Sequence, residues 1–216
     1  RDGDLGIQTR FSDNSSVSST NLVPGNWLPT SWTFDVPTEA DIDMAEFNLS
    51  FEPDVVLSIN SVGSMRPDLP PGHIALAKHT LDLTGRVWTF HDDSATHADM
   101  TDHFDSELSN IIAGSLKESQ EIVPHVIVAQ MTGPQFETPA EINALMNMGA
   151  DVVGMTLAAE AKLLAECDCR HIGLSVSSNW AAGQTPGDST AEIDHHAVEG
   201  LASTVHGRLW TALTSC

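Results

Sequence analysis

The sequence predicts an α/β domain with a mostly parallel central sheet flanked by helices. From residue 54 onward, short runs of β-branched and aliphatic residues alternate with longer helix-like segments. The short runs are apolar throughout, as expected of strands buried on both faces, and strands that alternate with helices are typical of a parallel sheet. Hydrophobic residues make up 41% of the 216-residue chain, which is enough for the core of one domain.

The first 53 residues differ from this pattern. Residues 12–20 are rich in serine, and residues 21–37 contain three prolines and two tryptophans. Turn-forming residues at this density favour irregular backbone. We therefore expect residues 1–53 to form an irregular segment of the same domain, and residues 54–216 to form its α/β part.

Four strands are predicted in the α/β part. Each is a short aliphatic run bounded by residues that favour turns. In chain order they are Val55–Ile59, Val126–Ala129, Val152–Met155 and Ile172–Val176.

Four helices are predicted between and after these strands. The first repeats apolar residues with helical spacing, and the third is rich in alanine and leucine. The second has Thr138 as its N-cap and Pro139 at its first position, and it ends before Gly149. The four ranges are 104–116, 139–148, 157–167 and 193–213.

The charge of the chain excludes a nucleic-acid binder. Thirty acidic residues stand against nine basic ones, which gives a formal net charge of -21. Nucleic acids are held mainly by cationic side chains on phosphates, and none cluster in this sequence. The acidity indicates either an ordinary solvated surface or adaptation to high salt, a halophilic character.

No segment of the sequence suggests a membrane protein or an exported one. No run approaches the roughly 20 apolar residues of a membrane-spanning helix, and the first ten residues are polar where a secretory signal is apolar. Cys167 and Cys169 form a C-x-C pair without the second pair that a zinc site needs. We expect a cytoplasmic protein with no membrane partner and no metal.

Small and polar residues follow each of the four predicted strands. Ligands of open α/β sheets bind beyond the carboxyl ends of the strands. One segment by itself is readily explained as an ordinary turn, but four in one chain indicate a ligand site. The first, after Ile59, resembles a turn whose backbone N–H groups face an anion. The four segments are residues 60–64, 133–138, 154–156 and 177–183.

These segments resemble the signatures of the purine nucleoside phosphorylase and methylthioadenosine phosphorylase family. The similarity covers the chain from about Asp54 to its C-terminus and is specific as a set. The segments that carry it are NSVGSMR at 60–66, GPQFETPAE at 133–141, GADVVGMT at 149–156 and SNWAAG at 178–183.

The resemblance implies an enzyme, a pentosyltransferase of purine salvage. Such an enzyme cleaves 6-oxopurine nucleosides, inosine or guanosine, with inorganic phosphate to give the free base and ribose 1-phosphate. Phosphate is the co-substrate, and no cofactor is implied. The resemblance also implies a homotrimer or a dimer of trimers, in which a neighbouring subunit completes the sugar pocket.

Three residues are implied to hold the purine. By resemblance, Phe136 stacks near the base, Glu137 accepts a hydrogen bond from its ring N–H, and Asn179 binds N7 and O6. A departing purine gains negative charge, which an amide donor at N7 stabilises. From the residues alone, Glu137 is equally a first-turn carboxylate favoured by the helix dipole, and Asn179 a turn-former.

Five residues are implied to hold the ribose and the phosphate. Met155 packs under the ribose, and His195 approaches its 5'-hydroxyl. Thr156 donates its hydroxyl to phosphate, and Ser61 meets phosphate and ribose through its backbone N–H. Arg10 is a weak counterpart of a family arginine that binds the same anion. From the residues alone, Met155 is equally a core residue and His195 a partly exposed polar one.

The chain also departs from the family. A Gly-Ser-Gly-type phosphate turn and an Arg-x-His element are missing, and there is no tyrosine. Either Arg10, Arg66 and Arg86 compensate, or the sequence begins inside the domain, or phosphorolysis has been lost. Two alternatives to a phosphorylase therefore stay open: a nucleosidase that uses water, and a purine-binding relative without turnover.

We expect the protein to become more stable as salt is raised to molar concentrations. Screening relieves the mutual repulsion of carboxylates in the compact state, and 30 of them stand against 9 basic residues. Melting temperatures in a potassium chloride series measure this effect. A melting temperature that stays flat or falls with salt would contradict halophilic adaptation.

Overall fold

The computed structural model of the chain contains two compact units, residues 1–54 and 55–216. The boundary between them lies beside the predicted one, and the expectation that both segments share one domain stays a prediction. The described residues are 6–10, 16–20, 46–50, 55–91, 93–117, 120, 122–193, 201, 205, 207–209 and 211–213.

The described stretches of the first unit form an antiparallel sheet. Its strands are β1 (Gly6–Arg10), β2 (Ser16–Thr20) and β3 (Glu46–Ser50), in the order β2-β1-β3. The prediction of an irregular N-terminal segment is therefore wrong for these residues. The reason is that β1 pairs with β3 across 35 intervening residues, and local turn signals carry no information about pairing at that distance.

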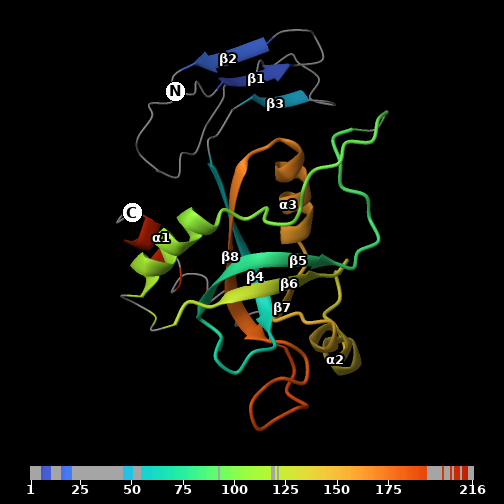
Figure 1. The fold of residues 1–216 in the computed structure, drawn as a ribbon, viewed down its shortest axis with the longest axis vertical. Helices are drawn as coiled ribbons and strands as arrows, with labels where there is room; N and C mark the ends of the chain where they lie inside the picture. Colours follow the sequence, from blue (N-terminus) through green and yellow to red (C-terminus); the bar gives the residue numbers. More distant parts are fainter. Residues whose placement is uncertain are drawn as a thin grey trace, which may run out of the picture. The chain divides into compact units, whose positions relative to one another are not determined.

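Five strands form a closed barrel in the second unit (Figure 1), in the order β4-β7-β6-β5-β8. The runs predicted at 126–129 and 172–176 lie in β6 and β8, the run at 55–59 begins β4, and the run at 152–155 extends one residue beyond β7. The strands are β4 (Val55–Ser64), β5 (Ile74–Asp82), β6 (His125–Gln130), β7 (Val152–Gly154) and β8 (Arg170–Trp180).

The sheet is mixed, and the prediction of a mostly parallel one needs correction. Three neighbouring pairs are parallel, β4 with β8, β5 with β6 and β6 with β7. Two are antiparallel, β4 with β7 and β5 with β8. The connection at 65–73 between β4 and β5 is too short for a crossover helix, so it reverses the chain direction.

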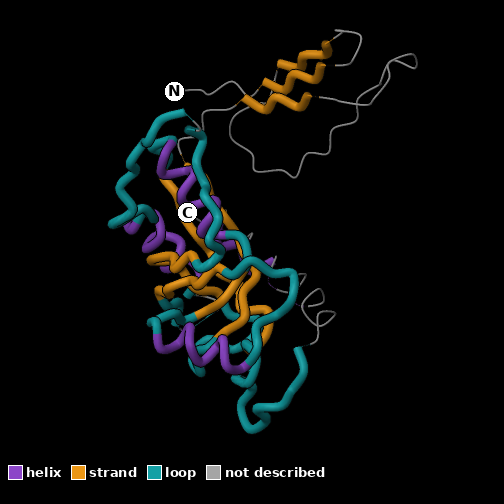
Figure 2. Tube along the Cα trace, turned by 90° about the vertical axis from the view of Figure 1, so that its right-hand side faces the viewer, coloured by secondary structure: helices purple, strands orange, loops and turns teal. Residues whose placement is uncertain are grey.

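Among the described residues, the helices with defined bounds lie outside the barrel (Figure 2), namely α1 (Ser106–Leu116), α2 (Pro139–Asn147) and α3 (Leu157–Glu166). The predicted N-cap of α2 is confirmed, since Thr138 and Glu141 form a capping box. Within the predicted terminal helix, the described residues 201, 205, 207–209 and 211–213 are helical, but Ile193 is not. None of the described helices is long and apolar enough to cross a membrane.

The core fixes the helices to the barrel. Leu157 and Ala161 of α3 pack with interior side chains of the strands, and both are nearly inaccessible to solvent. Ile142 and Leu145 of α2 pack against Ala129 at the end of β6 and its neighbours. Burial of a leucine or isoleucine contributes about 1.5–3 kcal/mol, so both helices are held firmly beyond the ends of β6 and β7.

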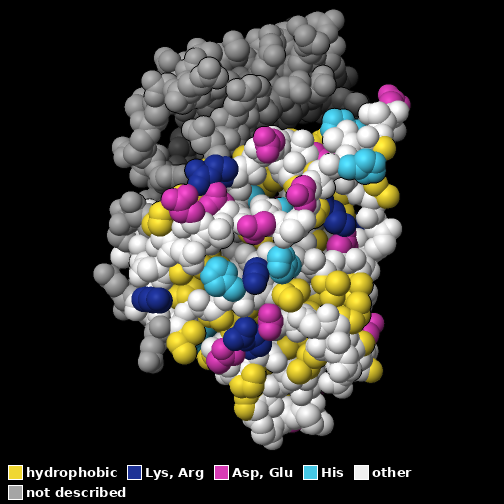
Figure 3. Space-filling model, in the orientation of Figure 1, with side chains coloured by type: hydrophobic (Ala, Val, Ile, Leu, Met, Phe, Trp, Pro, Cys, Tyr) yellow, Lys and Arg dark blue, Asp and Glu magenta, His cyan; other side chains and the backbone are white. Residues whose placement is uncertain are grey.

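Charged side chains are interspersed on the face of the molecule drawn in Figure 3. Acidic, basic and histidine side chains lie among one another there, and the basic ones do not gather into a patch. Some of the acidic charge is locally compensated. Asp68 pairs with Arg66 at 2.6 Å, and Asp105 pairs with Arg170 at 2.6 Å. On this face the excess of carboxylates is therefore spread over the surface.

Candidate functional site

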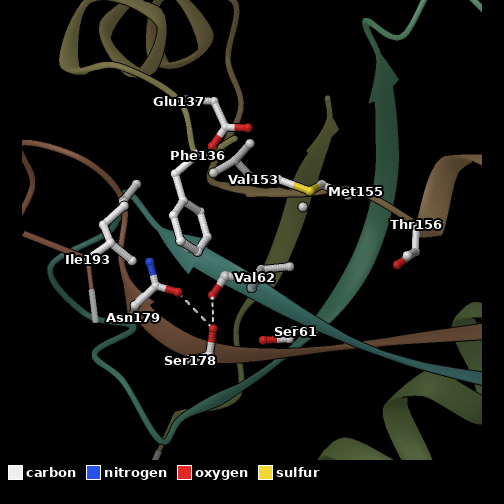
Figure 4. Close-up of a pocket in the computed structure, with 13 residues that line it drawn as sticks. Ser61, Val62, Phe136, Glu137, Val153, Met155, Thr156, Ser178, Asn179 and Ile193 are labelled. Carbon is white, nitrogen blue, oxygen red and sulfur yellow. Dashed lines mark hydrogen bonds between the residues drawn. The ribbon is translucent and has the colours of Figure 1, made fainter. Parts of the chain in front are cut away.

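A cavity of about 280 Å³ lies where three strands of the second unit meet the segments that lead into two of its helices (Figure 4). The C-terminal halves of β4 and β8 form one side of the cavity. The other side is formed by β7 and by the residues just before α2 and α3. The described residues that line it are Ser61, Val62, Gly63, Phe136, Glu137, Val153, Gly154, Met155, Thr156, Ser178, Asn179, Ala181 and Ile193.

The cavity brings together six of the eight residues singled out in the sequence. The other two are not placed there: His195 lies outside the described residues, and Arg10 belongs to the first unit, where only the backbone of its strand is described. The role of each residue stays a prediction. The six that share the cavity are Ser61, Phe136, Glu137, Met155, Thr156 and Asn179.

Two of the lining segments are strands, although turns were predicted. Residues 60–64 continue β4, and residues 177–180 continue β8. The two ends pair with each other in parallel, so the predicted small-residue turn with N–H groups around an anion does not form. Pairing across more than 100 residues outweighs the local preference of small residues for turns.

An irregularity in this pairing places Asn179. The register shifts between Val62 and Gly63, so that Val62 pairs with Ser177 and Gly63 with Asn179, and Ser178 is the extra residue. A Cβ atom on Gly63 would lie 3.3 Å from the side-chain nitrogen of Asn179. The bulge and the glycine together leave room for the amide beside β4.

The amide of Asn179 is held in one orientation. The hydroxyl of Ser178 donates to Oδ1 of Asn179 at 2.8 Å, and Nδ2 of Asn179 donates to the backbone oxygen of Trp180 at 2.8 Å. An amide has two N–H hydrogens and two oxygen lone pairs. One donor and one acceptor position therefore remain for a ligand. Because Asn179 lies within β8, the alternative that it merely forms a turn is wrong.

Glu137 is not needed to cap α2. Glu141 accepts from the backbone N–H of Thr138 at 2.7 Å, and the hydroxyl of Thr138 accepts from the N–H of Glu141 at 3.3 Å. The half-buried Glu137 instead lines the cavity. Burial raises the pKa of its carboxyl above the usual 4.5, and the charge of Glu141 raises it further. It is therefore a carboxylate that gains by accepting an N–H from a ligand.

Apolar side chains form the remaining walls. Phe136 is 43% exposed, and it faces the cavity together with Val153 and Met155 (Figure 4). Met155 packs against Gly133, whose φ is +64° and where a Cβ atom would lie within 2.4 Å of the sulfur. A side chain at this position would be strained by the positive φ and would have to displace Met155. A flat apolar group of a ligand in this cavity would therefore contact the aromatic ring of Phe136 and the thioether of Met155.

Ser178 and Ile193 line the cavity, although neither was predicted as a site residue. Ser178 stands within the segment that carries the resemblance, but its importance depends on the bulge, which has no local signal. Ile193 is the one described residue of the 193–213 range in the cavity wall, and an isolated isoleucine after a polar loop gives no sign of a site.

No described residue of the cavity wall is basic. Arg66 is engaged elsewhere, since its guanidinium contacts Asp68 at 2.6 Å and Asp151 at 3.6 Å. Arg86 lines a neighbouring cavity of about 250 Å³, whose wall also contains Met155 and Thr156. Arg86 thus lies beside the candidate site, whereas Arg10 belongs to the first unit.

The described residues contain no group of three or more histidine, cysteine, aspartate or glutamate side chains placed to hold a metal ion. The lining of the cavity consists of one carboxylate, one amide, three hydroxyl groups and apolar side chains. This set is suited to a small, partly aromatic molecule with several hydrogen-bonding atoms.

Comparisons with known proteins identify the family of the chain. The model of the family described as "Phosphorylase superfamily" matches residues 37–214. A probable 6-oxopurine nucleoside phosphorylase of Thermococcus kodakarensis is 35% identical over 145 residues, 62% of this chain and 54% of that protein. A probable S-methyl-5'-thioinosine phosphorylase of Methanosarcina acetivorans is 38% identical over 138 residues, 63% of this chain and 53% of that protein. The chain spans about half the length of these relatives.

Solved structures show the same fold. A methylthioadenosine phosphorylase from an antarctic soil metagenomic library has a TM-score of 0.63 at 23% identity, over 75% of this chain and 58% of that one. Methylthioadenosine phosphorylase from Schistosoma mansoni, in complex with adenine, has a TM-score of 0.63 at 21% identity, over 73% of this chain and 62% of that one. At this identity the likeness concerns the fold alone.

We expect Glu137→Ala to weaken binding of the 6-oxopurine hypoxanthine more than tenfold. An unpaired buried donor on the base costs about 1–3 kcal/mol, and about 1.4 kcal/mol corresponds to tenfold. Titration calorimetry at fixed ionic strength measures the affinity. In the unchanged protein, affinity should fall on acidification at a pH above the usual 4.5 of glutamate, because the raised pKa lets the carboxylate protonate there.

Glu141→Ala is the matched control for this measurement. It removes a carboxylate from the same segment and opens the capping box of α2, but it does not touch the cavity. It should lower the melting temperature and leave hypoxanthine affinity unchanged. If the two variants bind hypoxanthine equally well, Glu137 has no part in base recognition.

Proposed function

Because this chain belongs to the phosphorylase superfamily, we propose that it is a purine nucleoside phosphorylase for 6-oxopurine nucleosides. It cleaves the glycosidic bond of inosine or guanosine with inorganic phosphate and releases the free base and ribose 1-phosphate. The observation that carries the proposal is the fixed amide of Asn179, which shares one cavity with Glu137 and Phe136.

The three base-binding residues complement a 6-oxopurine. Asn179 has one free N–H left to donate, which suits N7 or O6 of the base, because both of these atoms accept hydrogen bonds and gain negative charge as the base departs. Glu137 accepts the ring N–H beside the 6-oxo group, a proton that adenine lacks. Phe136 covers the face of the ring. The match to both the 6-oxo group and the neighbouring N–H favours hypoxanthine and guanine over adenine.

The reaction requires little covalent chemistry from the protein. A phosphate oxygen forms a bond to C1' while the bond from C1' to the purine nitrogen breaks, and its electron pair passes to the base. The sugar resembles an oxocarbenium ion at the transition state. Met155 supports the ribose, while Thr156 and Ser61 face the phosphate. Catalysis then rests on positioning and on stabilising charge at the departing base.

The 5' position of the sugar distinguishes the substrates of related enzymes. The relatives carry names for 6-oxopurine nucleosides and for S-methyl-5'-thioinosine, whose base is also a 6-oxopurine. Both kinds of nucleoside contain the 6-oxopurine base that we propose Asn179 and Glu137 to bind. We propose an unmodified 5'-hydroxyl, with His195 approaching it, in a cytoplasmic homotrimer or dimer of trimers of purine salvage. Methylthioadenosine phosphorolysis is the alternative if the discrimination at the base lies elsewhere.

Release of free base from inosine, measured with and without phosphate, tests the reaction type. We expect release that depends on phosphate and produces ribose 1-phosphate in equal amount. Equal release without phosphate would identify a nucleosidase that uses water. Binding of hypoxanthine without any release would identify a purine-binding protein without turnover.

We expect inosine and guanosine to be preferred over adenosine and methylthioadenosine by at least tenfold in kcat/KM, which corresponds to about 1.4 kcal/mol. Asn179→Asp should narrow or reverse the preference, because a carboxylate accepts from a 6-amino group and repels a 6-oxo group. Ser178→Ala should narrow it less, because it only frees the amide to rotate.

Asn147→Asp is the control for this series. It introduces the same charge at an exposed position near the end of α2, outside the cavity wall. The preference should survive this change. Equal or better use of methylthioadenosine by the unchanged protein would move the assignment to the methylthioadenosine branch of the family.

A further inference from the structure

The first turn of α3 is capped by a side chain from another part of the chain. Thr156 occupies the N-cap position, but its side chain makes no capping hydrogen bond. Oε1 of Gln130, at the end of β6, accepts from the backbone N–H of Ala158 at 2.5 Å and from that of Ala159 at 3.1 Å. These are the two N–H groups that an N-cap side chain normally binds.

The other two helices are capped in the usual way. In α1 the carboxylate of Asp105 accepts from the third residue of the helix, Leu108, at 2.8 Å. In α2 the hydroxyl of Thr138 accepts from the third residue, Glu141. Thr138 and Thr156 are therefore the same residue type at the same cap position, but Thr138 has an extended backbone (φ -76°, ψ 159°) and caps its helix, whereas Thr156 has φ -133° and ψ -44° and does not.

The side chain of Gln130 has little freedom to do anything else. It is 2% exposed, and the oxygen must face α3, because the NH₂ group of an amide cannot accept a hydrogen bond. The backbone oxygen of Gln130 accepts from Leu83 at 3.0 Å, which fixes the end of the strand. Turning the amide away would leave two N–H groups of α3 without a partner, and buried donors rarely lack one.

Thr156 is exposed and lines both the candidate site and the neighbouring cavity that contains Arg86. Its hydroxyl points toward the side of the cavity where Ser61 lies (Figure 4). Among the described residues of the cavity wall, the groups that can donate to an anion are neutral, and the Thr156 hydroxyl is one of them. A hydroxyl that turned back to cap α3 would be lost to the ligand.

We propose that Gln130 is a positioning residue: by capping α3 in place of Thr156, it leaves the Thr156 hydroxyl free to bind the phosphate co-substrate. This inference rests on the proposed phosphorylase function. It assigns a role to a buried glutamine that makes no contact with the nucleoside pocket itself, since Gln130 lines only the neighbouring cavity.

Gln130→Met tests the proposal, because methionine fills a similar volume without an accepting oxygen. The backbone of Thr156 is then expected to become extended, like that of Thr138, so that the Thr156 hydroxyl caps α3. The KM for inorganic phosphate should rise about tenfold, a change of about 1.4 kcal/mol. The KM for inosine and kcat should stay within about twofold of the unchanged protein. If Gln130→Met does not fold, Gln130→Asn withdraws the oxygen by one methylene and serves the same test.

Gln120→Met is the matched control. Gln120 is also buried, at 5% exposure, and its Oε1 accepts from the backbone N–H of Ile74 at 2.8 Å. The residue lies outside both cavity walls. Its replacement should lower the melting temperature without a change in the KM for phosphate. If the KM for phosphate rises equally in Gln130→Met and Gln120→Met, the effect is a general structural one and the proposal is overturned.

A double-mutant cycle with Thr156→Val separates the proposed route from others. If Gln130 acts through the Thr156 hydroxyl, Gln130→Met should add nothing to the effect of Thr156→Val on the KM for phosphate. Additive effects, or an unchanged KM in Gln130→Met, would overturn the proposal.

A crystal structure of Gln130→Met gives a readout that does not depend on activity. We expect Oγ1 of Thr156 within hydrogen-bond distance of the N–H of Ala158 or Ala159. An unchanged Thr156 side chain would overturn the proposed exchange of caps. Absence of phosphate-dependent release by the unchanged protein would instead refute the proposed function, so the two failures are distinguishable.

Discussion

The parallel pairing of β4 with β8 is the constraint on which the candidate site depends. The two strands pair from Val55 and Arg170 to Ser64 and Trp180, and the extra residue Ser178 enters just before they end. Without that shift of register, Asn179 would stand opposite a different residue of β4 and lose its place beside Gly63. The site is therefore built by one irregular ladder rather than by a loop.

The starts of two helices complete the site in different ways. At α2, Thr138 and Glu141 satisfy each other, which leaves the carboxylate of Glu137 available to the cavity. At α3, a distant glutamine satisfies the backbone, which leaves a hydroxyl available. Both arrangements depend on the buried apolar faces of the helices, which hold each first turn beyond the ends of β6 and β7.

The acidity of the chain bears on how the proposed phosphate co-substrate would be bound. The net charge of -21 disfavours the approach of phosphate, and the described wall of the cavity carries no basic side chain. Hydroxyl groups and oriented backbone dipoles act over short distances, where the general field of the molecule matters less. Arg86 lies in the wall of the adjoining cavity, which shares Met155 and Thr156 with the candidate site.

The sequence by itself determined the α/β character, the cores of the predicted strands, the cap of α2 at Thr138 and six residues that share one cavity. These features depend on local hydrophobic pattern, on capping chemistry or on short motifs. Tertiary structure alone decided the mixed strand directions, the closed barrel, the bulge at Ser178 and the cap supplied by Gln130. Each of these joins residues far apart in the chain, and the free energy of such contacts depends on the folded arrangement, so no local pattern encodes it.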